Sequence, residues 1–118
     1  MARVDLEQLL GAVDRKDVDA FVSFLAEDAV FRYGSQDPVR GKAAIRDSVA
    51  MFLGMIPAIS HRLIDTWERD DTLVCQGEVT YTLLDGREVT IPFVNVFRLD
   101  GELIRDYLVY VDPTPLAG

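Results

Sequence analysis

The stretch EVTIPFVNVFRLDGELIRDYLVYV, residues 88–111, decides the fold of this chain. It contains two runs rich in β-branched and aromatic residues, separated by the dipeptide Asp100-Gly101. An Asp-Gly pair between two such runs predicts a β-hairpin. Apolar side chains occupy both faces of the first run: Ile91, Phe93 and Phe97 on one face, Val94 and Val96 on the other. One face of this strand can therefore pack against helices. Because the second face is also apolar, its burial against another protein surface is favourable as well.

The second run of this hairpin contains a carboxylate in an unusual place. Counting with a period of two puts Asp106 on the same face as Ile104, Leu108 and Tyr110. A buried carboxylate is costly unless it is paired, hydrogen-bonded or protonated. We therefore expect Asp106 to be either a well-satisfied structural acid or a working acid/base group.

Outside the hairpin, three predicted helices precede further strands. Residues 4–28 show helical spacing with a break near Asp17, which is a plausible N-cap for the second helix. A short strand, a turn-rich loop and a third helix stopped by Pro57 follow, at residues 29–33, 34–41 and 42–56. Four strands then form a predicted antiparallel meander, at residues 59–68, 72–83, 88–99 and 102–111.

The composition indicates one globular domain spanning residues 1–118, with 49% hydrophobic and 27% charged residues. No apolar run approaches the roughly 20 residues that cross a bilayer. The first ten residues carry acids among the leucines and lack the features of a secretory signal. We therefore expect a cytoplasmic protein that does not contact a membrane.

The net charge and the numbers of cysteine and histidine residues argue against nucleic-acid binding, disulfide frameworks and Cys/His metal sites. Twenty acids against twelve bases give a net charge of −8, which repels phosphate backbones and argues against a nucleic-acid partner. Cys75 is the only cysteine and His61 the only histidine, so a disulfide framework and a Cys/His metal site are excluded. We expect neither a metal nor an organic cofactor.

The order of the elements, with DPVRGKAAI (residues 37–45) leading into the third helix and VYVDPTPL (residues 109–116) after the strands, resembles the nuclear transport factor 2-like superfamily. The chain is most similar to its SnoaL-like group, which includes polyketide cyclases and relatives of ketosteroid isomerase and limonene-epoxide hydrolase. The resemblance implies one SnoaL-like α+β domain, a cone-shaped curved antiparallel sheet wrapped around three N-terminal helices, also described as a cystatin-like roll. An apolar pocket opens at the wide end of such a cone.

The resemblance also implies a set of site residues. Asp106 occupies the place of the aspartate that activates water in the RDY motif of epoxide hydrolase relatives, and Tyr33 and His61 join it as candidate catalytic residues. A phenol donates hydrogen bonds, and an imidazole takes or gives a proton near neutral pH. The candidate ligand-binding residues are the other side chains expected to line the cone: Asn95, Phe31, Phe93, Phe97, Leu108, Tyr110, Ile59, Trp67 and Met55.

Each candidate also has a purely structural interpretation. Asp106 can be held by Arg105, and a lone histidine in a strand is as often a satisfied wall residue. Asn95, which stands where steroid isomerases carry an oxyanion-hole acid, can bind a ligand or tie the sheet to a loop. Trp67 and Met55 are as consistent with a core as with a pocket.

The chain departs from both groups of enzymatic relatives. Glu78 and Thr80 stand where epoxide hydrolase relatives have an arginine and an aspartate, and Phe31 and Tyr33 replace their tyrosine and asparagine. Steroid isomerases have a base aspartate near Tyr33 and a tyrosine near Leu9, and both are absent. Neither activity is therefore transferred.

The sequence leads to an enzyme hypothesis with two alternatives. In the first, the pocket binds a hydrophobic polycyclic or terpenoid molecule, and Asp106 performs cofactor-independent acid/base chemistry in an isomerase, cyclase, hydratase or epoxide hydrolase reaction. The alternatives are a non-catalytic ligand-binding or dimerisation module of the same fold, and a protein-interaction domain that uses the exposed sheet. The simplest cover for the second apolar face is a homodimer packed through the back of the sheet.

Overall fold

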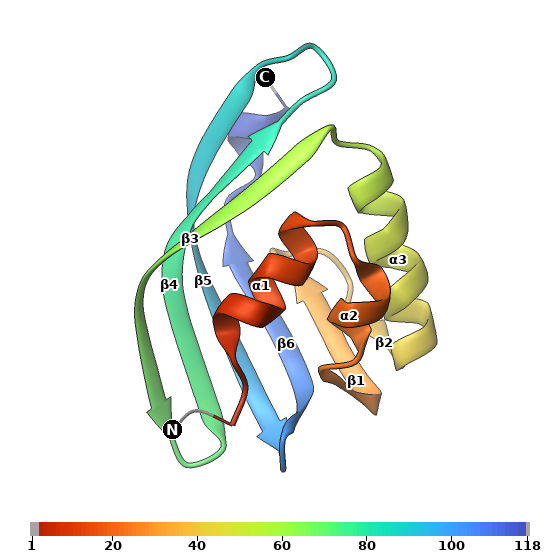
Figure 1. Ribbon diagram of the computed structural model, residues 1–118, viewed down its shortest axis with the longest axis vertical. Helices are drawn as coiled ribbons and strands as arrows, with labels where there is room; N and C mark the ends of the chain where they lie inside the picture. Colours follow the sequence, from red (N-terminus) through yellow and green to blue (C-terminus); the bar gives the residue numbers. More distant parts are fainter. Residues whose placement is uncertain (1–2, 118) are drawn as a thin grey trace.

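The computed structural model describes residues 3–117, which form a curved six-stranded sheet with three α-helices in its hollow (Figure 1). The helices are α1 (Leu6–Asp14), α2 (Val18–Val22) and α3 (Lys42–Gly54), and a short 3₁₀ helix, η1 (Thr114–Leu116), follows the last strand. The strands are β1 (Leu25–Tyr33), β2 (Val39–Arg40), β3 (Ala58–Arg69), β4 (Thr72–Thr82), β5 (Glu88–Asp100) and β6 (Leu103–Val111). The predicted α+β class, a curved sheet wrapped around helices, is confirmed.

The two N-terminal helices begin at side-chain caps. The Asp17 carboxylate accepts a hydrogen bond from the backbone N–H of Ala20 at 3.0 Å, which confirms Asp17 as the N-cap of α2. Asp5 caps α1 in the same way, accepting from the N–H of Gln8 at 3.2 Å. Among residues 3–117, no helix is long and apolar enough to cross a membrane.

The sheet order is β2-β1-β6-β5-β4-β3. Strands β3 to β6 form the predicted antiparallel meander. Strand β1 is longer than predicted and runs parallel to β6, with Phe31 opposite Tyr107 and Tyr33 opposite Val109. The sheet is therefore mixed rather than wholly antiparallel, because local alternation does not determine which strand becomes the neighbour.

A β-bulge interrupts β6. Leu99 pairs with Ile104 while the preceding Arg98 pairs with Asp106, so Arg105 is an extra residue. An extra residue exchanges the two faces of the strand beyond it. Asp106 therefore lies on the opposite face from Ile104, and period-two counting across the bulge gives the wrong face.

A second bulge interrupts β3. Leu63 pairs with Gly77 while Asp65 pairs with Gln76, so Ile64 is the extra residue. The faces of β3 are exchanged beyond this point, as in β6.

Gly77 on β4 lies directly opposite this second bulge. A Cβ atom at Gly77 would lie 2.2 Å from the carbonyl oxygen of Arg62 and 3.0 Å from the ring of Phe93. The backbones of β3 and β4 therefore approach more closely here than any residue with a side chain permits. This close approach accompanies the curl of the two long strands over α1 (Figure 1).

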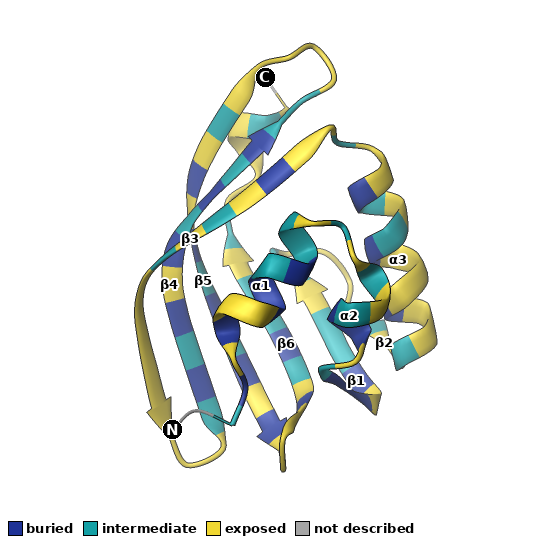
Figure 2. Cartoon of the chain, in the orientation of Figure 1, coloured by how far each residue is buried: buried dark blue, intermediate teal, exposed yellow. Residues whose placement is uncertain are grey.

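The buried side chains lie on the concave face of the sheet and on the helices that fill it (Figure 2). Strand β5 shows the alternation most regularly, with alternate residues from Ile91 to Leu99 buried and those between them partly or fully exposed. Helix α1 packs against β3 and α3 packs against β1, while α2 contacts both other helices. The core is therefore closed by helices on one side of the sheet only.

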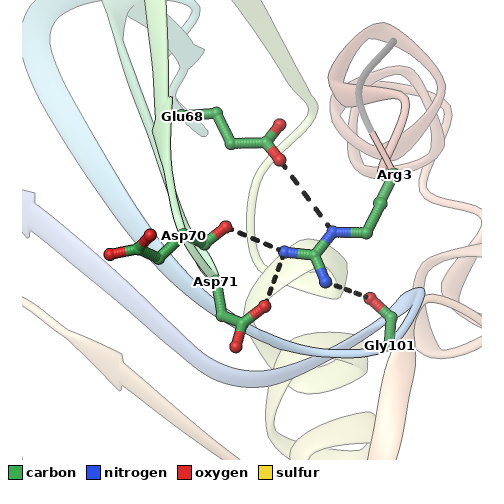
Figure 3. Close-up of polar contacts among 5 residues, drawn as sticks. All are labelled: Arg3, Glu68, Asp70, Asp71 and Gly101. Carbon is green, nitrogen blue, oxygen red and sulfur yellow. Dashed lines mark hydrogen bonds and ion pairs between the residues drawn. The ribbon is translucent and has the colours of Figure 1, made fainter.

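Arg3 links two turns of the sheet (Figure 3). Its guanidinium donates to the carbonyl oxygen of Asp70 at 3.1 Å and to that of Gly101 at 3.2 Å. It also forms ion pairs with Asp71 at 2.9 Å and Glu68 at 3.9 Å. One side chain thus joins the β3–β4 turn to the β5–β6 turn.

The outer face of the sheet carries an apolar row that crosses four strands. The register aligns Trp67, Val74, Val96 and Leu108 from β3 to β6. All four are partly or fully exposed, so residues 3–117 do not cover the apolar residues on the second face of β5. The homodimer through this face stays a prediction.

Candidate functional site

A cavity of about 140 Å³ lies between the concave face of the sheet and the three helices. Six predicted site residues line it: Tyr33, His61, Asn95, Phe31, Phe93 and Ile59. An engineered apolar cavity of roughly 150 Å³ accommodates a benzene ring. The cavity therefore has room for about one ring.

Asp14 and His61 form a carboxylate–imidazole pair at the cavity wall. His61 Nδ1 lies 2.6 Å from Asp14 Oδ1, and the backbone N–H of His61 donates to Asp14 Oδ2 at 3.0 Å. Asp14 is the last residue of α1 and His61 belongs to β3, so the pair joins a helix end to the sheet. Only 12% of the His61 side chain and 26% of the Asp14 side chain are exposed.

The carboxylate determines which imidazole nitrogen carries the hydrogen. Because a carboxylate only accepts, Nδ1 of neutral His61 donates, and Nε2 keeps its lone pair. The imidazole also packs edge-on against Phe93, with ring centroids 5.4 Å apart. The imidazole is fixed at Nδ1, lies in the wall of the cavity, and has no hydrogen bond to Nε2 within residues 3–117, which is the arrangement that a general base requires.

Two tyrosine hydroxyls meet at the cavity. Tyr33 projects from β1 and Tyr81 from β4, and their oxygens lie 3.0 Å apart. Strands β6 and β5 lie between these two strands in the sheet, so the hydroxyls meet only because the sheet curls on itself. Phe52 of α3 packs against both rings, at 5.9 and 6.1 Å.

The tyrosine pair is held in the neutral form. Burial raises the pKa of Tyr33, and the hydrogen bond from Tyr81 lowers it by less. Burial is also the main cause that raises the pKa of Tyr81, and the contact with Tyr33 adds to it. Two neutral hydroxyls share one hydrogen bond, so one O–H remains available to donate to a ligand oxygen.

Asn95 on β5 is the third polar group of the cavity. It is buried, with 2% of its surface exposed, and it lines the cavity. Its side-chain oxygen has no hydrogen-bond partner among residues 3–117.

Asp106 does not reach the cavity, and its predicted placement on the inner face is wrong. The bulge at Arg105 turns Asp106 outward, where its Oδ2 lies 3.4 Å from two nitrogens of Arg105, and Tyr107 takes the inner position. Leu108 and Tyr110 were predicted to face inward with Asp106, and both lie outside the cavity lining. Leu108 is partly exposed, and Tyr110 is 58% exposed.

Three other predicted ligand-binding residues also lie outside the cavity lining. Trp67 lies on the outer face, because the bulge at Ile64 reverses its direction, and is 51% exposed. Met55 follows the last residue of α3 and is 62% exposed. Phe97 does lie on the inner face, but it is fully buried against Tyr107, with ring centroids 4.7 Å apart.

Glu78 and Thr80 lie on the outer face of β4. Glu78 accepts a hydrogen bond from Arg62 at 2.5 Å, and the Thr80 hydroxyl lies 2.8 Å from that of Thr90. Glu78 is partly exposed, on the face of β4 opposite to the buried Tyr81.

Sequence reasoning missed Asp14 and did not select Tyr81. Tyr81 follows the same alternation as the buried Cys75 and Val79, which could have identified it. Asp14 stands in the last turn of α1, where the helix dipole disfavours a negative charge, and this is a weak signal of a tertiary partner. Within residues 3–117, no group of three or more His, Cys, Asp or Glu residues could hold a metal ion.

Comparison with known protein families identifies the fold. The sequence profile of the SnoaL-like domain matches residues 6–107. The chain belongs to the SnoaL-like domain family. No curated protein matches this SnoaL-like chain in sequence.

Solved structures with the same fold include proteins of several kinds. An NTF2-like protein of unknown function from Burkholderia pseudomallei has a TM-score of 0.86 at 17% identity, over 94% of this chain and 90% of its own. A protein assigned as a SnoaL-like polyketide cyclase from Jannaschia has a TM-score of 0.82 at 15% identity, over 95% and 85%. An LEH-like epoxide hydrolase from M. tuberculosis has a TM-score of 0.80 at 16% identity, over 92% and 80%. At sequence identities of 15 to 17%, these similarities show a shared fold. They confirm the predicted NTF2-like fold.

Proposed function

We propose that this SnoaL-like domain is an acid/base enzyme that removes a proton next to the carbonyl group of a small hydrophobic compound, without a metal or organic cofactor. His61 is the proton acceptor, Asp14 positions it, and the Tyr33–Tyr81 pair donates a hydrogen bond to the carbonyl oxygen. The observation that carries this proposal is the Asp14–His61 pair in the wall of a cavity that also holds two neutral hydroxyls.

The proposed step balances within these residues. The C–H bond next to the carbonyl breaks, its proton goes to His61 Nε2, and its electron pair forms the enolate, whose negative charge lies on the carbonyl oxygen. The free tyrosine O–H donates to this oxygen, and such a donor stabilises charge more strongly in a buried site than in water. The Asp14 carboxylate stabilises the imidazolium that forms, and returning the proton to another carbon completes an isomerisation.

The fold supports this class of reaction without selecting one member. Isomerisation and aldol cyclisation both begin with an enolate, and a protein assigned as a polyketide cyclase shares the fold. In our proposal His61 replaces Asp106 as the base, because Asp106 lies outside the cavity beside Arg105. The ligand is expected to be a compound of about one ring, as the cavity volume supports.

The test measures proton abstraction directly and needs no knowledge of the natural substrate. The protein is incubated in deuterated water with cyclohexanone, cyclohexenone or acetophenone, and the loss of the protons next to the carbonyl is followed by NMR. We expect the wild-type protein to exchange at least one ketone faster than the same concentration of free imidazole. The His61→Gln variant should lose this exchange, and Asp106→Asn, which changes an outward carboxylate, should keep it.

The variants separate the competing accounts. Full exchange by His61→Gln, or loss of exchange in Asp106→Asn, would overturn the proposed roles. Binding of these ketones without any exchange by the wild-type protein would favour the alternative of a ligand-binding module.

A further inference from the structure

The exposed residues of the cavity lining indicate where the cavity opens to solvent. Most lining residues are buried or partly buried, because they lie between the sheet and the helices. Among the described residues 3–117, the lining residues that are exposed are Gln36, in the β1–β2 loop, and Ser48, on α3. A side chain that both lines a cavity and meets solvent lies at the opening. We call this pair, Gln36 and Ser48, the entrance.

The loop side of the entrance is fixed to the sheet. The Gly34 N–H donates to the carbonyl oxygen of Val109 on β6 at 2.9 Å, and Gly34 has a φ of +57°, which glycine adopts readily. The Gln36 N–H donates to the carbonyl oxygen of Tyr33 at 3.1 Å, which closes a turn. The Gln36 carbonyl oxygen accepts from Arg32 Nε at 3.0 Å. These bonds hold the backbone of the loop, so the Gln36 side chain starts from a defined position.

The helix side of the entrance adjoins the tyrosine pair. Ser48 precedes Phe52 by four residues, so the two side chains are neighbours on one face of α3. Phe52 packs against the rings of Tyr33 and Tyr81, with centroids 5.9 and 6.1 Å apart. Gln36 follows Tyr33 by three residues on the loop side. The entrance is therefore connected on both sides to the residues that we assign to bind the carbonyl oxygen.

The entrance offers hydrogen bonds without charge. The cavity has room for about one ring, so any further part of a ligand has to extend past the entrance toward solvent. The Gln36 amide and the Ser48 hydroxyl each donate and accept hydrogen bonds. An uncharged group that also donates and accepts, such as an amide, is complementary to both side chains.

We propose that Gln36 and Ser48 are specificity-determining residues that bind an uncharged polar group of the substrate, so that the preferred substrate is a one-ring ketone carrying an amide-like substituent at the entrance. This inference rests on the proposed function for the ketone. It adds a second recognition element, which neither His61 nor the tyrosine pair supplies.

The test compares ketones with and without an amide substituent. Dissociation constants of acetophenone, meta-acetamidoacetophenone and para-acetamidoacetophenone are measured by calorimetry for wild type, Gln36→Leu, Ser48→Ala and the double variant. The matched controls Gln76→Leu and Ser60→Ala remove an exposed amide and an exposed hydroxyl from positions outside the cavity lining.

Two hydrogen bonds that each contribute about threefold give about tenfold in affinity. We therefore expect wild type and both controls to bind at least one acetamido ketone about tenfold more tightly than acetophenone. Gln36→Leu and Ser48→Ala should each reduce this preference to about threefold, and the double variant should bind all three ketones equally.

The outcomes distinguish this inference from the proposed function. Equal binding of the three ketones by wild type, or a preference that survives in the double variant, would overturn the role of the entrance, even where proton exchange is observed. A preference that depends on Gln36 and Ser48 supports the inference even where no proton exchange occurs, in which case only the proposed catalysis fails. Loss of the preference in Gln76→Leu or Ser60→Ala, or no binding of any of the three ketones, also overturns the inference.

Discussion

Replacing Gly77 by alanine tests the close approach of β3 to β4. The added Cβ would lie 2.2 Å from the Arg62 carbonyl oxygen, whereas real contacts of this kind are essentially never shorter than 3.0 Å. The backbone of β3 would have to move by at least 0.8 Å, and the Phe93 ring already lies at the 3.0 Å limit. Overpacking of this kind costs about 1 to 3 kcal/mol, and the upper end applies here because the obstructing atom belongs to the backbone.

The assay is urea unfolding, with Gly54→Ala as the matched control. We expect Gly77→Ala to lower the free energy of unfolding by about 3 kcal/mol, a large part of the 5 to 15 kcal/mol that stabilises a typical domain. A Cβ at Gly54, the last residue of α3, has no neighbour within 4 Å, so Gly54→Ala should be neutral or stabilise by up to about 1 kcal/mol. A loss below about 1 kcal/mol for Gly77→Ala would refute the account of the close approach.

Two further predictions concern alkaline pH and the N-terminal segment. Burial raises the pKa of Cys75 from its ordinary value of 9.0 to about 11, so this thiol contributes stability that is complete below about pH 9 and is lost as the pH rises toward 11. Wild type should therefore lose roughly 2 kcal/mol more than Cys75→Ala between these pH values in urea unfolding, and equal losses would contradict this. Arg3→Met should lower the free energy of unfolding by about 1 kcal/mol and speed amide hydrogen exchange in the turns around Asp70 and Gly101. Unchanged exchange in both turns would show that the guanidinium does not join them.

The sequence was sufficient for those parts of the fold that depend on local pattern. The Asp17 cap and the alternation from Ile91 to Leu99 were confirmed, because each depends on a few neighbouring residues. The parallel pairing of β1 with β6 was not predicted. It depends on which distant strand becomes the neighbour, and the pattern of a single strand does not contain that information.

The largest errors in the candidate site have one physical cause. A bulge adds one residue and exchanges the faces of a strand, so Asp106 beyond Arg105 and Trp67 beyond Ile64 both turned outward. Neither bulge contains a glycine that would have indicated it. The prediction for His61 was correct in placement, since it precedes the bulge in its strand.

The partner of His61 could not be found from local pattern. Asp14 lies 47 residues away in the sequence and reaches the imidazole only because α1 packs against β3. Tyr33 and Tyr81 likewise meet because the sheet curls across two intervening strands. The polar groups of the site are therefore brought together by tertiary structure, while the apolar lining follows from alternation.

The measurement that tests the central claim most directly is the tautomer of His61, read from long-range proton–nitrogen NMR correlations of the neutral imidazole. His61 is the only histidine in the chain, so its signals need no separate assignment. The account predicts the hydrogen on Nδ1, held by Asp14, and a switch away from this tautomer in Asp14→Asn. A hydrogen on Nε2 in the wild-type protein would contradict the account, because the nitrogen assigned to accept the substrate proton would already carry one.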